Sequence, residues 1–96
     1  MVEIEWSESA KEDLKNIQHY VSQNSPSYSE FFLNGILEKI EYLKEFPQMG
    51  RQVPESDDPN DRELIFQNYR IIYIFSSEKV IIEMIIHGSR LLNLKK

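Results

Sequence analysis

The sequence predicts an α+β fold in which an antiparallel helical hairpin covers one face of a mainly antiparallel sheet. Residues 69–90 have the pattern of two long strands joined by a polar turn. Two earlier stretches repeat apolar residues every three or four positions, which indicates amphipathic helices. We therefore expect the element order β-α-α-β-β-β in a single domain that spans residues 1–96.

The first predicted elements are a short strand at 2–6, where polar and apolar residues alternate, and a helix after it. Ser7 or Ser9 can cap this helix, and Ser9 with Glu12 has the spacing of a capping box. Residues 22–25 end it. Its apolar stripe consists of Ala10, Leu14, Ile17 and Val21.

A second helix is expected to begin at Ser25 and Pro26, because proline is tolerated in the first turn, and to end at Pro47. We expect a loop over residues 48–60, which include Gly50 and several acidic residues. The stripe of the second helix consists of Tyr28, Phe32, Ile36, Ile40 and Leu43, widened by Phe31, Leu33 and Leu37.

The strand partners follow if Ser77 and Glu78 form a two-residue hairpin loop. That loop would pair Phe75 with Val80, Tyr73 with Ile82, Ile72 with Glu83 and Tyr69 with Ile86. A second hairpin through Gln67 and Asn68 would pair Leu64 with Ile71, Glu63 with Ile72 and Ile65 with Arg70.

Side chains alternate across a strand, so these strands should have two different faces. The face expected to form the core carries Leu64, Phe66, Tyr69, Ile71, Tyr73, Phe75, Val80, Ile82, Met84 and Ile86. The opposite face mixes Ile65, Ile72, Ile74, Ile81 and Ile85 with Asp61, Glu63, Arg70, Glu83 and His87. We expect a functional site or a partner on this second face.

The net charge of −5 is distributed unevenly along the chain. Residues 1–46 hold four basic residues against nine acidic ones, whereas the remainder is balanced. The chain therefore lacks the overall basic character of many nucleic-acid-binding proteins. A local basic patch is a remaining alternative, formed by Arg51, Arg62, Arg70, Arg90, Lys95 and Lys96. Because there is no cysteine, signal peptide or long apolar run, we expect a soluble cytoplasmic protein.

Four phrases carry a resemblance to a known family. They are S-x-S-A-x-x-D-L-x-x-I at 7–17, FPQMGR at 46–51, NYRIIY at 68–73 and IIHGSR at 85–90. Together, in this order, they resemble the RelE/ParE superfamily of toxins from type II toxin–antitoxin modules, and the His-Gly-x-Arg ending is closer to the ParE-like branch.

The resemblance implies a growth-inhibiting toxin that a cognate antitoxin neutralises in a hetero-oligomeric complex, as in plasmid-stabilisation modules. ParE-like members inhibit DNA gyrase, whereas RelE-like members cut mRNA on the ribosome. An inactive homologue that keeps only antitoxin binding is a third alternative. No alternative requires a metal ion or another cofactor. For gyrase binding, the candidate target-binding residues are Arg51 and Arg90.

If the protein were a nuclease, its catalytic residues would be Arg70, His87, Glu83 and Glu63. Cleavage by the 2′-hydroxyl needs a base, an acid and a cation on the phosphate, which a glutamate, His87 and Arg70 would provide. The alternative, which we favour, is that these charges form structural ion pairs. The acidic composition and a C-terminal segment without an acid–base group also favour the ParE-like reading.

An apolar surface opposite the helical hairpin would suit the antitoxin. The candidate antitoxin-binding residues are Ile65, Ile72, Ile74, Ile81 and Ile85. We expect an antitoxin segment to cover part of this face or to add a strand along an exposed edge.

Overall fold

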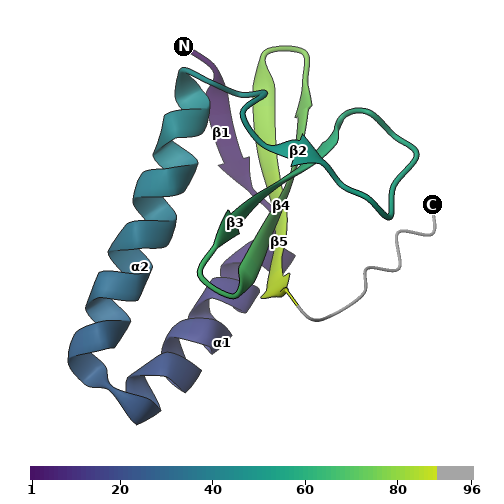
Figure 1. Ribbon diagram of the computed structural model, residues 1–96. Helices are drawn as coiled ribbons and strands as arrows, with labels where there is room; N and C mark the ends of the chain where they lie inside the picture. The colour runs from purple at the N-terminus through teal and green to yellow at the C-terminus, as the bar shows by residue number, and fades with distance from the viewer. Residues whose placement is uncertain (89–96) are drawn as a thin grey trace.

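The computed structural model describes residues 1–88 and confirms the predicted α+β architecture (Figure 1). Arg90, a predicted target-binding residue, and the C-terminal segment after it lie outside the described residues. The elements are β1 (Glu3–Trp6), α1 (Glu8–Asn24), α2 (Pro26–Glu41), the 3-10 helix η1 (Tyr42–Lys44), β2 (Arg51–Gln52), β3 (Asp61–Phe66), β4 (Tyr69–Ser76) and β5 (Lys79–His87).

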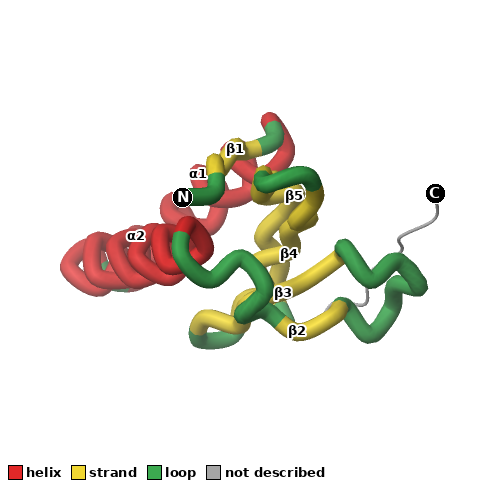
Figure 2. Tube along the Cα trace, turned by 90° about the horizontal axis from the view of Figure 1, so that it is seen from above, coloured by secondary structure: helices red, strands yellow, loops and turns green. Residues whose placement is uncertain are grey.

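The strands form a mixed five-stranded sheet in the order β1-β5-β4-β3-β2. β1 lies parallel to β5, with Ile4 opposite Val80, and the other neighbours are antiparallel. β2 falls inside the segment that we expected to be a loop, and its two residues pair with β3. The helices lie on one side of the sheet, and the chain after β2 extends on the other (Figure 2).

The helix ends follow ordinary capping chemistry. Ser7, rather than Ser9, is the N-cap of α1, and its Oγ accepts a hydrogen bond from the Ala10 amide at 2.9 Å. Ser25 caps α2 as predicted, with Pro26 in the first turn. α2 ends at Glu41 and continues as η1, so it is shorter than the expected helix.

The helical hairpin buries its apolar stripe against the sheet. Ala10, Phe32, Ile36, Ile40 and Leu43 are all at most 3% exposed. They pack with the sheet residues Leu64, Ile71, Tyr73, Val80, Ile82 and Ile85 in one cluster. Phe31 and Leu37, expected to widen the stripe of the second helix, are instead 63% and 42% exposed.

Both predicted hairpins are present. Ser77 and Glu78 have φ angles of 53° and 64°, as the central residues of a type I′ turn require. At the other turn Gln67, not Asn68, adopts the left-handed conformation, with φ of 54°. The predicted pairs between β3 and β4 are confirmed, and those between β4 and β5 are confirmed as far as Tyr73 opposite Ile82.

The register of β5 shifts at a β-bulge that the sequence analysis missed. Ile72 lies opposite Met84 rather than Glu83, and Tyr69 lies opposite His87 rather than Ile86. Glu83 is the additional residue, so every later side chain of β5 turns to the other face. Ile85 therefore enters the core.

The remaining face assignments after the bulge were also wrong. Met84 and Ile86, which were predicted to be core residues, lie opposite Ile72 and Arg70 on the face away from the helices. His87, predicted on that face, instead lies beside Tyr69 on the helix side of the sheet.

Side chains of the first helical turns hold the bulge in place. The Ser7 hydroxyl donates to the carbonyl of Glu83 at 2.8 Å. The Asp13 carboxylate accepts from the amide of Ile85 at 3.0 Å. Both residues belong to the phrase at 7–17, so this phrase has a structural role: it caps α1 and satisfies the backbone of the bulged strand.

We expect Asp13→Ala to lower the free energy of unfolding by about 1.5–3 kcal/mol, because the Ile85 amide loses a charged acceptor. Urea denaturation measures this change. Glu12→Ala is the matched control, since Glu12 is exposed on the same helix and should change stability by less than about 0.5 kcal/mol. Equal effects of the two substitutions would contradict this role for Asp13.

Candidate functional site

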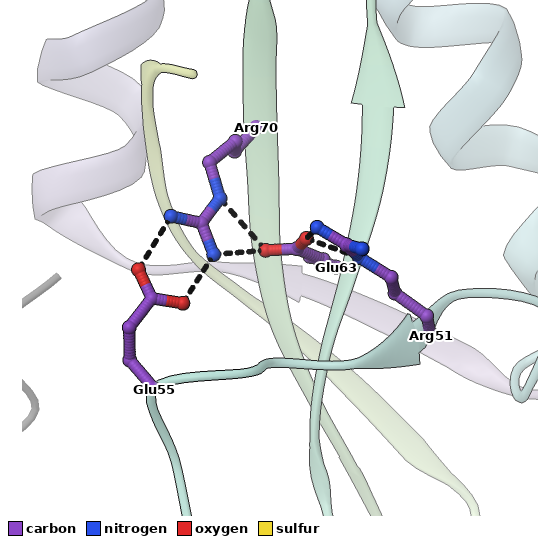
Figure 3. A network of polar contacts seen from close by, with 4 residues as sticks. All are labelled: Arg51, Glu55, Glu63 and Arg70. Carbon is purple, nitrogen blue, oxygen red and sulfur yellow. Dashed lines mark hydrogen bonds and ion pairs between the residues drawn. The ribbon is translucent and has the colours of Figure 1, made fainter. Parts of the chain in front are cut away.

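Charged side chains from three strands and a loop converge on the sheet face opposite the helices (Figure 3). Arg70 comes from β4, Glu63 from β3 and Arg51 from β2. Cross-strand pairing places Arg51 directly opposite Glu63. Glu55 reaches the same place from the loop that follows β2. We call these residues, Arg51, Glu55, Glu63 and Arg70, the charge network.

Arg70 is the centre of the charge network. Its Nη1 and Nη2 donate to the two oxygens of Glu55, each at 2.7 Å, in a bidentate pair. Its Nε donates to Oε1 of Glu63 at 2.8 Å, and Nη2 also contacts that oxygen. The guanidinium therefore bridges a strand carboxylate and a loop carboxylate.

The second oxygen of Glu63 is bound by Arg51. Nε and Nη2 of Arg51 both lie 2.6 Å from Oε2 of Glu63. The side chain of Glu63 is 0% exposed and that of Arg70 is 7% exposed, whereas the Arg51 side chain is 63% exposed. Both oxygens of Glu63 are thus engaged in a site that water hardly reaches.

Local hydrogen bonds order the loop that carries Glu55. The Val53 amide donates to the Asp61 carbonyl at 3.1 Å, and Val53 is fully buried. The Ser56 hydroxyl donates to the Asp61 carboxylate at 2.5 Å and accepts from the Asp58 amide at 3.0 Å. Since Glu55 lies between these anchors, its carboxylate is held near Arg70 by the loop itself.

The electrostatics of the site favour the charged form of Arg70. The hydrogen bonds that Arg70 donates to Glu55 raise the pKa of Arg70, burial opposes this, and contacts with Glu63 raise it further. The charge network contains equal numbers of cations and carboxylates, so its charges compensate each other. Removing Arg70, the buried cation, would leave both carboxylates without their shared partner, which is strongly destabilising.

The predicted catalytic residues are only partly brought together. Glu63 and Arg70 are in contact. Glu83 lies at the bulge, where its carbonyl is bound by Ser7. His87 is exposed, and its ring packs edge-on against Tyr69 at 5.5 Å. An open pocket of about 670 Å³ nevertheless has both Arg70 and His87 in its lining.

The predicted apolar antitoxin surface is smaller than expected. Ile72 is 0% exposed, and Ile85 lies in the core at 2% exposure because of the bulge. Ile65 is 45% exposed, whereas Ile74 and Ile81 are half-buried. Of the five predicted residues, Ile65, Ile74 and Ile81 are accessible to a partner.

Tyr73 links two of the sequence phrases in a way that the sequence analysis did not predict. Its hydroxyl donates to the Pro47 carbonyl at 2.8 Å and accepts from the Gly50 amide at 3.0 Å. A Cβ at Gly50 would lie 2.6 Å from both that hydroxyl and the Glu63 carbonyl, so the position requires glycine. Burial raises the pKa of Tyr73, although the hydrogen bond from Gly50 opposes this.

Arg62 of β3, the cross-strand partner of Tyr73, also binds this turn. Its Nη1 donates to the carbonyls of Gln48 at 3.2 Å and Gly50 at 2.7 Å. The phrase at 46–51 therefore forms a turn that positions Arg51 for the charge network. The sequence did not indicate a role for Glu55, because this residue lies in an irregular loop without a periodic pattern.

The chain thus combines a helical hairpin on one face of a mixed sheet with a cluster of charged residues on the other. Residues 4–92 match the family described as the ParE toxin of the type II toxin–antitoxin system, parDE. The chain belongs to this family. Among curated proteins, none is a significant match in sequence.

Solved structures with a similar fold include members of both branches. The chromosomal ParDE system of P. aeruginosa aligns with 23% identity and a TM-score of 0.73, over 91% of this chain and 96% of that chain. The isolated E. coli RelE toxin aligns with 12% identity and a TM-score of 0.65, over 95% and 88%. The RelBE2 toxin–antitoxin complex of Mycobacterium tuberculosis aligns with 16% identity and a TM-score of 0.58, over 90% and 96%.

The described residues were also searched for metal-binding groups and for membrane-spanning helices. Among residues 1–88, no group of at least three histidine, cysteine or acidic residues is arranged to hold a metal ion. No helix among the described residues is sufficiently long and apolar to cross a membrane.

We expect Arg70→Ala to lower the free energy of unfolding by about 3–5 kcal/mol, because Glu63 and Glu55 would be left without their shared cation. Chemical denaturation at neutral pH measures the loss. Arg51→Ala is the matched control: its side chain is exposed and Glu63 keeps Arg70, so the loss should be about 1 kcal/mol or less. A loss for Arg70→Ala no larger than that of the control would contradict a structural role for the charge network.

Proposed function

We propose that this protein is the toxin of a type II toxin–antitoxin module and acts in the cytoplasm by binding and inhibiting DNA gyrase. A cognate antitoxin neutralises it in a hetero-oligomeric complex. Membership of the ParE toxin family supports this proposal. The state of the charge network supports action by binding rather than by cutting RNA.

The proposal rests on one observation: Arg70 and Glu63 bind each other. A ribonuclease needs a base that can reach the 2′-hydroxyl and a cation that can reach the phosphate. The Glu63 side chain is fully buried with both oxygens bound, and Arg70 donates to two carboxylates. Using them in catalysis would require the charge network to open, at the cost of buried ion pairs.

The alternative function is ribosome-dependent mRNA cleavage, as in RelE-like toxins. One observation favours it: His87 is exposed and lines the same pocket as Arg70. A histidine in that position can donate a proton to a leaving oxygen. An inactive homologue that only binds its antitoxin is the remaining alternative.

For target binding we propose Arg51 and Arg90. The Arg51 side chain is 63% exposed although it binds Glu63, so part of its guanidinium is accessible to a partner. For the antitoxin we propose the accessible remainder of the face opposite the helices, formed by Ile65, Ile74 and Ile81. Ile72 is buried and Ile85 belongs to the core on the helix side of the sheet, so neither is part of this surface.

We expect induction of the wild-type protein in bacteria to stop growth, to induce the DNA damage response and to leave translated mRNA intact. His87→Ala should be equally toxic, because it removes the exposed acid–base group without opening the charge network. Growth curves, a damage-response reporter and primer extension on a translated mRNA measure these outcomes. Arg70→Ala is unsuitable as a catalytic test, because its expected loss of stability would itself reduce toxicity.

The outcomes separate the alternatives. If the wild-type protein causes mRNA cleavage and His87→Ala does not, the protein acts by RNA cleavage and not by gyrase inhibition. Normal growth with folded wild-type protein would indicate the inactive homologue. Arg51→Ala adds a test of the target-binding residue, with reduced toxicity expected while the fold is retained.

A further inference from the structure

The contact between Glu55 and Arg70 is the part of the charge network that an outside group can replace (Figure 3). Arg70 Nε donates to Glu63 at 2.8 Å and Nη2 contacts the same carboxylate, so Arg70 keeps a buried partner when Glu55 turns away. The Glu55 side chain is 21% exposed, whereas that of Glu63 is 0% exposed. Opening this contact therefore leaves the buried pair of Glu63 and Arg70 unbroken.

The edge of Arg70 that Glu55 covers has the geometry of a carboxylate-binding site. Its Nη1 and Nη2 donate to the two carboxylate oxygens of Glu55, each at 2.7 Å. Two parallel hydrogen bonds of this kind are the strong, specific way in which a guanidinium binds a carboxylate. Because Glu63 fixes the Nε side, the guanidinium is oriented before a ligand arrives, which lowers the entropic cost of binding.

An open pocket gives an outside carboxylate access to this edge. The pocket has a volume of about 670 Å³, and its lining includes Arg51, Glu55, Ile65 and Arg70. Arg51 binds Glu63 through Nε and Nη2, and its side chain is 63% exposed, so its Nη1 is accessible from the pocket. A carboxylate that binds Arg70 would therefore have a second cation beside it.

The charges of the described residues at this pocket favour a single carboxylate. Without Glu55, the two arginines of the charge network and Glu63 carry one net positive charge, which one carboxylate neutralises. The chain as a whole has a net charge of −5. It therefore repels a polyanion such as a nucleic acid through many charges at once, whereas an acidic side chain brings only one.

We propose that Glu55 is an internal ligand in a binding site for an acidic side chain of the target protein, and that the target carboxylate replaces Glu55 on Arg70. The identity of the partner rests on the proposed function. In the free protein Glu55 is autoinhibitory, because it competes with any outside carboxylate for Arg70. The exchange leaves Glu63 bound to Arg70, so it does not create the accessible base that RNA cleavage needs.

Peptide binding by matched variants of one loop tests the carboxylate site. Glu55→Gln and Asp57→Asn each remove one charge from this loop, and Asp57 is exposed. The probes are a short synthetic peptide with glutamates in a glycine–serine background and the same peptide with glutamines. We expect the full-length Glu55→Gln protein to bind the glutamate peptide at least about tenfold more tightly than wild type does, because the internal competitor is weakened. NMR titration measures the affinities.

The controls locate the peptide in the pocket. Asp57→Asn should bind the glutamate peptide like wild type, and the glutamine peptide should show no gain with any variant. Adding Arg51→Ala to Glu55→Gln should reduce the gain. Glu55→Ala should show the same gain as Glu55→Gln, and circular dichroism checks that both variants fold. Equal affinities of wild type and Glu55→Gln, or an equal gain with Asp57→Asn, would overturn the proposal. Preferential binding of a single-stranded RNA oligonucleotide by Glu55→Gln would assign the site to nucleic acid and also overturn it.

Gyrase assays with the same variants separate this proposal from the proposed function. We expect Glu55→Gln to inhibit supercoiling at a concentration at least about tenfold lower than wild type, and Asp57→Asn to match wild type. Inhibition by wild type that Glu55→Gln does not improve would overturn the role of the site in target binding. A gain in peptide binding without any effect on gyrase would support the carboxylate site and contradict the proposed function.

Discussion

The β-bulge at Glu83 is the constraint on which the arrangement of both sheet faces depends. One additional residue in β5 turns Ile85 into the core and moves His87 to the side of Tyr69. The bulge is held from α1, where Ser7 binds the Glu83 carbonyl and Asp13 binds the Ile85 amide. The helical hairpin therefore does more than cover the sheet, because it also determines which side chains of β5 face outward.

The sheet face away from the helices contains buried charges that compensate each other. Glu63 and Arg70 are almost inaccessible to water, and Glu55 completes the site from the loop after β2. The turn at residues 46–51, held by Tyr73 and Arg62, brings Arg51 to the same carboxylate. The phrases at 46–51 and 68–73 are thus in contact, and each supplies one arginine of the charge network.

Local patterns were sufficient to predict the helices, the two hairpins and the α+β class. The stripe of α2 and the turn at Ser77 and Glu78 depend on nearby residues, so their chemistry is visible in the sequence. The bulge was missed because Ser7, which stabilises it, lies 76 residues before Glu83. The predicted proximity of Glu63 and Arg70 is confirmed, but His87 was assigned to the wrong face because of the bulge. Glu55 was missed because an irregular loop gives no periodic signal.

We propose that this toxin acts by binding DNA gyrase, with the buried pair of Glu63 and Arg70 intact. The most direct measurement is a supercoiling and DNA-cleavage assay with purified gyrase and purified toxin, in the absence of ribosomes. We expect added toxin to inhibit supercoiling or to trap cleaved DNA in proportion to its concentration. Unchanged gyrase activity, together with cleavage of mRNA when the same preparation is added to translating ribosomes, would contradict it.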